Sequence, residues 1–166
     1  MILAFDTYYY ENYAKTICLC FDEWSDRTYT SIYDETLDNS VEYIPGEFYK
    51  KELPYILSIM RQINLQNVNY IIIDGFVFLD DNNKFGLGAH LYESLDNKIP
   101  VIGIAKTNFA TIEKNKKYLY RGKSKNPLFV TSIGINIEQA MEKVKLMNGE
   151  YRIPTLLKEL DKLTKK

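Results

Sequence analysis

The chain has 166 residues, 46% of them hydrophobic and 14% aromatic, so it can bury a core within one domain, residues 1–166. Its 21 Lys and Arg nearly balance 22 Asp and Glu, which excludes a strongly basic protein held to nucleic acid by bulk charge. A strand pattern begins at once and no long apolar segment occurs, so we expect a cytoplasmic protein without a membrane span.

The first third of the chain predicts an antiparallel meander of three strands, because aromatic and β-branched segments are separated by turn residues. The predicted strands are residues 2–9, 13–24 and 28–36. Cys18 and Cys20 alternate with an apolar residue in the second strand, a spacing that suits neither a zinc site nor a redox pair. We therefore expect buried, reduced thiols.

Helices and strands alternate in the rest of the chain. Apolar residues from Leu53 to Ile63 fall on one helical face, and Pro54 suits the first turn of that helix. The further predicted elements are a strand at 70–73, a helix at 86–96, a strand at 99–105, a hairpin at 118–133 and helices at 137–144 and 156–163. This order predicts an α/β fold with a central mixed β-sheet flanked by helices, the layout of ribonuclease H-like three-layer domains.

Charge is unevenly distributed along the chain. Residues 1–105 carry 16 acidic and 7 basic side chains, whereas residues 106–166 carry 6 acidic and 14 basic ones. Residues 114–125 contain six basic side chains and no acidic one, with Tyr118 and Tyr120 among them. This basic segment is either a strip that follows nucleic-acid phosphates or a solvated, lysine-rich hairpin.

Two aspartates directly follow apolar residues of predicted strands, Asp6 in the first strand and Asp74 after residues 70–73. Because sites in α/β sheets gather at strand ends, the two carboxylates could share a cation, with Glu52 as a third ligand. Oxygen donors without a Cys or His cluster suit Mg²⁺ or Mn²⁺, which can activate water near a phosphate. The alternative is that all three are ordinary turn and helix-end acids.

Two further polar residues lie near these elements. Lys106 follows the strand at 99–105 and would emerge near the same sheet edge as Asp74, where it could meet a phosphate. His90 is the only histidine, so neither a histidine-based metal cluster nor a hydrolase triad can be built. His90 is either satisfied by neighbours on a helix face or part of a site.

Seven short motifs, in register from the first strand to the last helix, resemble those of the endonuclease V family. They are Asp6-Thr7-Tyr8-Tyr9, Tyr43-Ile44-Pro45-Gly46, Lys50-Lys51-Glu52-Leu53-Pro54, Asp74-Gly75, Gly86-Leu87-Gly88-Ala89-His90, Ile102-Gly103-Ile104-Ala105-Lys106 and Tyr151-Arg152-Ile153-Pro154. The resemblance implies a metal-dependent nuclease that recognises hypoxanthine, the base of inosine, and cuts one phosphodiester beyond it.

The resemblance also implies roles for particular residues. Asp6, Glu52 and Asp74 would bind Mg²⁺ and position the attacking water, and Lys106 would hold water or the phosphate in line. The wedge that fills the gap left by a flipped nucleotide would consist of Tyr43, Ile44, Pro45 and Gly46. The pocket for the flipped base would be formed by Phe48, Gly75, Gly86, Leu87 and His90, with main-chain groups at the glycines reading the base edge.

Two departures from the family pattern bear on activity. Residues 78–83 are acidic where the family has H-P-R, and Ile135 stands where the family's S-x-G-H motif has a histidine that the resemblance assigns to the active site. Three functions therefore stay open. The first is a monomeric, Mg²⁺-dependent endonuclease that cuts on the 3′ side of deaminated adenine in DNA or RNA, for repair or RNA handling. The second is a catalytically impaired relative that only binds nucleic acid, and the third is a different metal nuclease on the same fold.

Overall fold

The structure is a computed structural model that describes residues 1–39, 48–109 and 111–166. Of Phe48 it describes the backbone and not the side chain. The predicted wedge, Tyr43 to Gly46, lies outside the described residues. No helix in the described part of the chain is long and apolar enough to cross a membrane.

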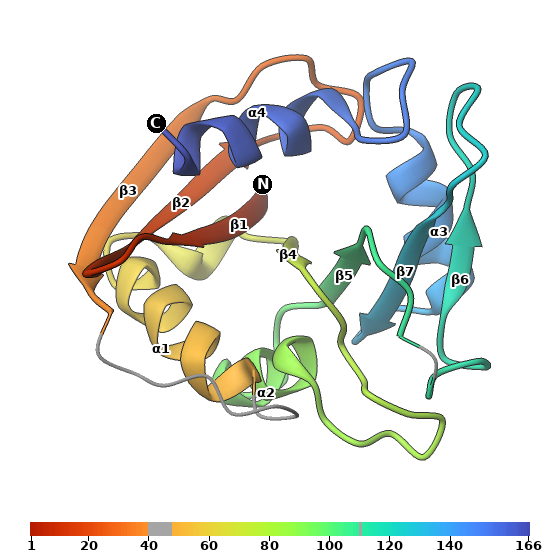
Figure 1. The fold of residues 1–166 in the computed structure, drawn as a ribbon, viewed down its shortest axis with the longest axis horizontal. Helices are drawn as coiled ribbons and strands as arrows, with labels where there is room; N and C mark the ends of the chain where they lie inside the picture. Colours follow the sequence, from red (N-terminus) through yellow and green to blue (C-terminus); the bar gives the residue numbers. More distant parts are fainter. Residues whose placement is uncertain (40–47, 110) are drawn as a thin grey trace.

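A seven-stranded mixed sheet forms the centre of the molecule, with strand order β3-β2-β1-β4-β5-β7-β6 (Figure 1). The strands are β1 (Ile2–Tyr9), β2 (Tyr13–Phe21), β3 (Ser31–Asp38), β4 (Tyr70–Asp74), β5 (Val101–Ala105), β6 (Lys117–Leu119) and β7 (Leu128–Ile133). Strands β1, β4 and β5 are parallel, whereas β1–β2, β2–β3, β5–β7 and β6–β7 pair antiparallel. The predicted α/β class with a mixed sheet is confirmed.

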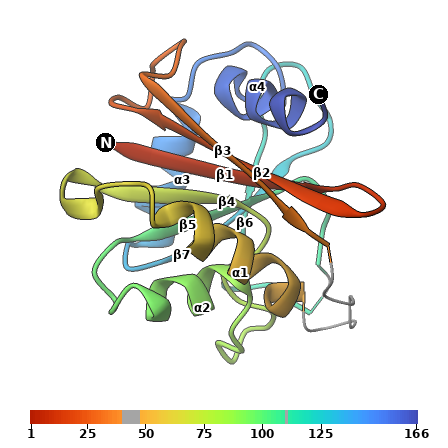
Figure 2. The same cartoon turned by 90° about the vertical axis from the view of Figure 1, so that its left-hand side faces the viewer.

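Helices cover both faces of this sheet (Figure 2). They are α1 (Phe48–Met60), the short 3₁₀ helix η1 (Leu65–Asn67), α2 (Leu87–Ser94), α3 (Ile137–Lys145) and α4 (Thr155–Thr164). Buried residues of α1 and α2 form one apolar cluster with the sheet, and those of α3 and α4 form a second cluster on the other face. The sheet is therefore the middle of three layers.

The central strands are apolar on both faces because helices cover both. Ile71, Ile72 and Ile73 of β4 are at most 2% exposed, as expected for a buried parallel strand. Cys18 and Cys20 are free and buried on the α1 side of β2, which confirms the predicted core thiols.

Several boundaries differ from the sequence prediction, among them those of the third strand, which is Ser31–Asp38 where residues 28–36 are predicted. Two of the differences have a clear physical reason. Strand β2 ends at Phe21, because the backbone N–H groups of Asp22 and Glu23 donate to the Asp26 carboxylate and start a turn. The placement of Pro54 in the first turn of its helix is wrong, because α1 begins at Phe48 and contains Pro54 in its interior. Burial of the apolar face of α1 offsets the backbone hydrogen bond that this proline removes.

Candidate active site

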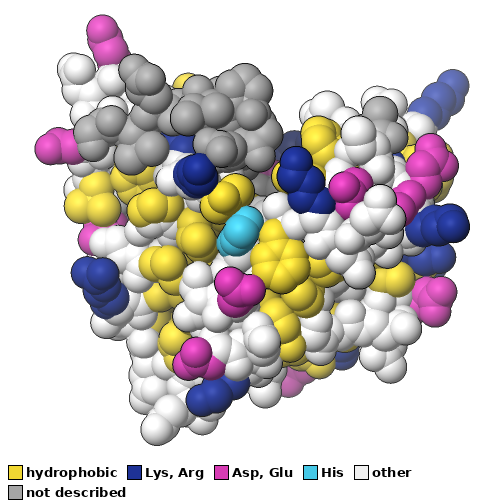
Figure 3. Space-filling model, turned by 90° about the horizontal axis from the view of Figure 1, so that it is seen from below, with side chains coloured by type: hydrophobic (Ala, Val, Ile, Leu, Met, Phe, Trp, Pro, Cys, Tyr) yellow, Lys and Arg dark blue, Asp and Glu magenta, His cyan; other side chains and the backbone are white. Residues whose placement is uncertain are grey.

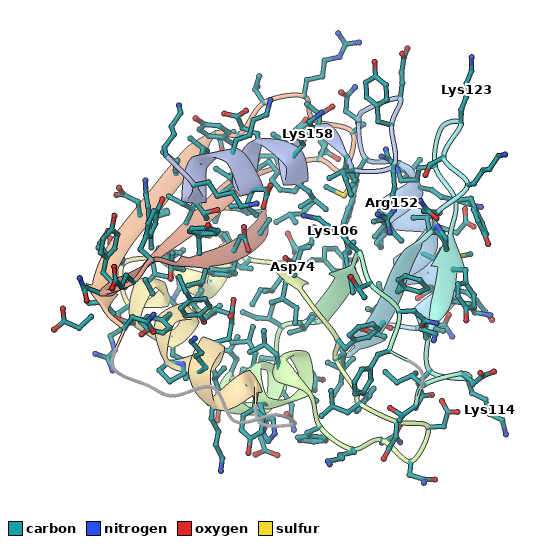
Figure 4. All side chains as sticks on the ribbon, in the orientation of Figure 1. Asp74, Lys106, Lys114, Lys123, Arg152 and Lys158 are labelled. Atoms are coloured by element: carbon teal, nitrogen blue, oxygen red, sulfur yellow. The ribbon has the colours of Figure 1, made fainter. Side chains whose placement is uncertain are left out.

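Two carboxylates lie side by side at the carboxyl edge of the parallel strands. Phe5 of β1 pairs with Ile73 of β4, so Asp6 and Asp74 are the next residues on neighbouring strands. Asp74 in turn pairs with Ile104 of β5, and Lys106 lies two residues beyond it. All three side chains line one cavity of about 30 Å³ between the sheet and α4, as Figure 4 shows for Asp74 and Lys106. The structure thus brings these predicted residues together.

Asp161 of α4 lines the same cavity, although no motif in the sequence points to it. Its Oδ1 lies 3.9 Å from Lys106 Nζ and 3.0 Å from Lys165 Nζ. Thr164, one turn later on α4, has its hydroxyl 3.2 Å from Oδ2 of Asp6. The sequence shows Asp161 only as an acidic residue next to an apolar position of the last helix. Its place in the site follows only when α4 is packed on the sheet.

The acids of this cavity repel one another. Burial raises the pKa of Asp6 to about 7, with further contributions from the negative charges of Asp74 and Asp161. The pKa of Asp74, whose side chain still reaches solvent, is also raised, first by partial burial, while Lys106 opposes the increase and Asp161 adds to it. Positive charge placed between these carboxylates would therefore be stabilised.

Glu52 approaches the same end of the sheet from α1, on the opposite face. It is 4% exposed, and the Tyr9 hydroxyl donates to its Oε2 at 2.7 Å. The pKa of Glu52 is raised to about 8: burial is the main cause, the Tyr9 hydrogen bond opposes it, and the charges of Asp6 and Asp74 add to it. Glu52 therefore interacts electrostatically with the other predicted acids.

The backbone of Lys106 is held by a second part of the chain. The Arg152 guanidinium donates to the carbonyl oxygen of Lys106 and, at 2.8 Å, to that of Pro127 (Figure 4). Arg121 is 7% exposed and donates to carbonyls of Met147 and Tyr151, which fixes the segment leading to Arg152. These two arginines hold the residues that follow β5.

The donor set suits a hard divalent cation in its chemistry. Within residues 1–39, 48–109 and 111–166, no group of three Asp, Glu, His or Cys side chains is arranged to hold one ion. Mg²⁺ does not require such a cage, because it commonly uses one or two carboxylates and completes its shell with water and substrate phosphate. The negative charges of Asp74 and Asp161 add to the effect of burial in raising the pKa of Asp6, so a cation bound among these acids would reduce their mutual repulsion.

Three residues predicted to line the base pocket, Gly75, Gly86 and Leu87, lie between the end of β4 and the start of α2. Gly75 adopts φ +140°, and a Cβ on it would meet open space. The Gly75 N–H donates to the Ile104 carbonyl and the Gly86 N–H to the Val77 carbonyl, so both amides are used within the fold, and the reading of a base edge by main-chain groups stays a prediction. A Cβ on Gly86 would lie 2.8 Å from the carbonyl oxygen of Phe76, so this glycine allows close packing. Leu87 is 4% exposed and belongs to the core.

His90 lies on the α1–α2 face of the molecule, among hydrophobic side chains (Figure 3). Its ring stacks on Tyr49 with centroids 3.7 Å apart and meets the Phe85 ring edge-on at 5.3 Å. Burial lowers the pKa of His90, which favours the neutral imidazole. These contacts describe a packed aromatic position outside the carboxylate cavity.

The basic segment does not form a continuous strip. Lys116 is 3% exposed and donates to Asn108, while Arg121 is used internally, as described above. Both interpretations of this segment, a phosphate-following strip and a solvated hairpin, fail at these two of its six cations, which are buried against backbone and side-chain oxygens. Lys114 and Lys123 lie at opposite ends of the β6 edge (Figure 4).

The acidic loop after β4 also has an internal role. The Asp81 carboxylate accepts backbone N–H groups of Glu113, Lys114 and Asn115 at distances between 2.8 and 3.2 Å. These hydrogen bonds lower the pKa of Asp81. The loop therefore anchors the segment between β5 and β6.

Ile135 does not occupy the carboxylate cavity, so the expected replacement of an active-site histidine there is wrong. Ile133 pairs with Val101 at the start of β5, whereas Lys106 follows the end of β5. Because β7 runs antiparallel to β5, residues after β7 lie at the opposite edge of the sheet. Ile135 lines a surface groove there with Tyr70 and Pro100.

Comparisons with known proteins agree with this architecture. A family model described as Endonuclease V matches residues 1–162. A search among curated proteins finds no match.

Three solved structures illustrate the structural similarity. Endonuclease V of Ciona intestinalis, in complex with a 24mer DNA containing an inosine followed by a ribo-adenosine, has a TM-score of 0.83 at 19% identity, covering 99% of this chain and 84% of that one. Human ENDOV has a TM-score of 0.74 at 17% identity, covering 99% and 82%. Endonuclease V of Bacillus subtilis has a TM-score of 0.76 at 18% identity, covering 99% and 78%. The predicted ribonuclease H-like fold is confirmed.

Proposed function

This chain belongs to the endonuclease V family, and on that premise we propose that it is a metal-dependent endonuclease that hydrolyses a phosphodiester on the 3′ side of hypoxanthine in DNA or RNA. The observation that carries the proposal is the convergence of Asp6, Asp74, Asp161 and Lys106 on one cavity at the carboxyl edge of the sheet. We further propose that residues 1–166 act as one domain, as a monomer, in the cytoplasm.

Asp6 and Asp74 are the residues that would hold Mg²⁺, or Mn²⁺, with Glu52 and Asp161 beside them. The bound cation would supply Lewis-acid stabilisation of the charge that develops on the phosphate. The match to the family and the mutual repulsion of the acids support this assignment.

The chain's own residues would orient the substrate around that centre. Lys106 Nζ is the cation available to a phosphate oxygen, since it extends from the end of β5 beside Asp161. Arg152 keeps the Lys106 backbone in place through its carbonyl oxygen. The Tyr9 hydroxyl fixes one oxygen of Glu52 and so limits its rotation. The wedge at Tyr43 to Gly46 and the pocket around Phe48, Gly75 and His90 remain proposed contacts of the substrate.

The test uses 5′-labelled oligonucleotides that carry one inosine, as single- and double-stranded DNA and as RNA, with Mg²⁺, Mn²⁺ or chelator. We expect a cut on the 3′ side of inosine that needs the metal and is lost in Asp74→Asn. Asp96→Asn is the matched control, because Asp96 is exposed after α2.

Three other outcomes would overturn the proposal. Binding of the inosine strand without a cut under every metal condition would support the impaired, nucleic-acid-binding relative. Equal cutting of an adenine control would indicate a nuclease without hypoxanthine specificity. Cutting that persists in Asp74→Asn would place the chemistry elsewhere.

A further inference from the structure

Three tyrosines form an ordered aromatic cluster on the β1–β2 hairpin. The rings of Tyr10 and Tyr13 stack with centroids 4.5 Å apart and an interplanar angle of 16°. Tyr8 meets Tyr10 edge-on at 4.9 Å. Tyr8 and Tyr13 are nevertheless 39% and 40% exposed, so much of their ring surface is in water. No other aromatic ring in the described part of the chain packs on Tyr13.

The cluster is held in place by the end of α4. The Tyr10 hydroxyl donates to the Thr164 carbonyl at 2.9 Å, and the Tyr10 N–H donates to the Tyr13 carbonyl at 2.8 Å across the turn. Figure 2 shows this hairpin projecting beyond the sheet at the end where the chain terminates. An exposed but fixed stack loses little conformational entropy when a further ring packs on it.

The cluster adjoins the carboxylate cavity. Tyr8 lies two residues after Asp6 and therefore on the same face of β1. Lys165 connects the two regions, since its Nζ lies 3.0 Å from Asp161 Oδ1 and 5.6 Å from the Tyr8 ring centroid. Lys15 pairs with Tyr8 across β1 and β2 and adds a second cation on this face.

We propose that Tyr8, Tyr10 and Tyr13 form a stacking platform for unpaired bases of the strand that is cut, with Lys15 and Lys165 contacting its phosphates. Aromatic side chains beside cations are the usual means of binding single strands, because every base has a π-face. Duplex bases are already stacked on one another and cannot use the platform. The inference rests on the proposed function and specifies its substrate as a strand that is unpaired beside the cut.

The test measures binding to a labelled single-stranded 12mer and to its duplex in chelator, so that no cleavage is needed. We expect Tyr8→Leu/Tyr13→Leu to weaken single-strand binding about 10-fold or more, because each stacked base contributes roughly 1–3 kcal/mol. Duplex binding should change less than about 2-fold. Strands with inosine and with adenine should lose affinity equally, since stacking does not read the base edge.

Two variants separate stacking from other effects. Tyr8→Phe/Tyr13→Phe should retain binding, because stacking needs the rings and not the hydroxyls, and it also controls for folding. Tyr118→Leu/Tyr120→Leu removes two exposed tyrosines, 47% and 61% exposed, at the far edge of the sheet and should have little effect.

The proposal is overturned if the Leu pair binds single strands normally, if duplex binding falls equally, or if the Tyr118 and Tyr120 control loses as much. After either of the first two outcomes, the cluster would be assigned to contact with another protein or to stabilising the hairpin. Binding and cleavage fail independently. Wild-type protein that cuts inosine strands while the Leu pair binds normally refutes the platform alone, whereas platform-dependent binding without any cut refutes the endonuclease alone.

Discussion

The two ends of the central sheet carry carboxylates in opposite settings. At the carboxyl end of β1 and β4, Asp6 and Asp74 face each other and Asp161, and their pKa values are raised. At the other end, Glu138 and Glu142 of α3 have side chains 68% and 65% exposed and pair with lysines at 3.7 and 3.5 Å. The carboxylate group is thus destabilised in its charged form at one end and solvated at the other. Repulsion between buried carboxylates lowers the stability of the fold, and a bound cation would relieve it, so their clustering favours a functional site.

Removing a carboxylate from each end is the strongest test of this contrast. We expect Asp74→Asn to reduce cleavage of an inosine strand by more than roughly 100-fold, because even partners of metal ligands cost 10–100-fold. Glu142→Gln, at the opposite end, should leave the rate unchanged. Initial rates at saturating Mg²⁺ decide the matter, and equal losses in both variants would remove the distinction between the ends.

Asp161 is expected to have the next largest effect. Its carboxylate lies between Lys106 and Lys165, so Asp161→Asn should release both lysines and lower the cleavage rate about 10–100-fold. Glu159→Gln, on the same helix, is the matched control and should be neutral. An unaltered rate in Asp161→Asn would restrict the site to the residues predicted from sequence.

The pH dependence of stability should also differ between the ends. The folded state raises the pKa of Asp6 to about 7 and that of Glu52 to about 8, so it binds protons that the unfolded chain has already released. The free energy of unfolding should therefore fall as pH rises from about 4 to about 8 and then level off. Each kcal/mol corresponds to roughly 2–4 °C in Tm for a chain of this size.

Thermal unfolding in chelator at pH 5 to 9 measures this slope. Asp6→Asn should flatten it and should unfold at a higher temperature than wild type at pH 8, while cleavage is lost. Mg²⁺ should raise the Tm more at pH 8 than at pH 5, because protons no longer compete for the carboxylates. A slope identical in wild type and Asp6→Asn would show that this carboxyl is not destabilised by folding.

Local patterns were sufficient to predict much of the fold and part of the site. The structure contains the strands predicted from the apolar run at 70–73 and from the meander of the first 36 residues, with strand ends shifted by a few residues. Asp6 and Asp74 were identifiable because each follows an apolar strand, and parallel neighbours end at one edge. A short stretch of sequence is enough to place a residue when its position depends only on the strand that it follows and on the direction of that strand.

The remaining features depend on packing between distant segments. Asp161 becomes a site residue only when α4 crosses the carboxyl edge, and the burial of Arg121 depends on carbonyls 26 to 31 residues later. The direction of β7 decides the placement of Ile135. A motif after β7 would lie at the carboxylate end of β5 if the two strands were parallel, and it lies at the opposite end because they are antiparallel. None of these relations has a signature in a short window of sequence.

The smallest expected effect tests the placement of Ile135. Ile135→His would restore the family-like S-x-G-H motif, yet the residue lies beyond the start of β5, next to Tyr70 and Pro100, while the carboxylates lie beyond its end. The length of β5 is roughly 16 Å at 3.3 Å per residue, too far for an imidazole to reach the cavity. We therefore expect cleavage rate and metal dependence to change less than about 2-fold, within ordinary surface-substitution effects. A large gain in rate would mean that the two ends of the sheet act on one substrate, and the division between a reactive and a solvated end would no longer hold.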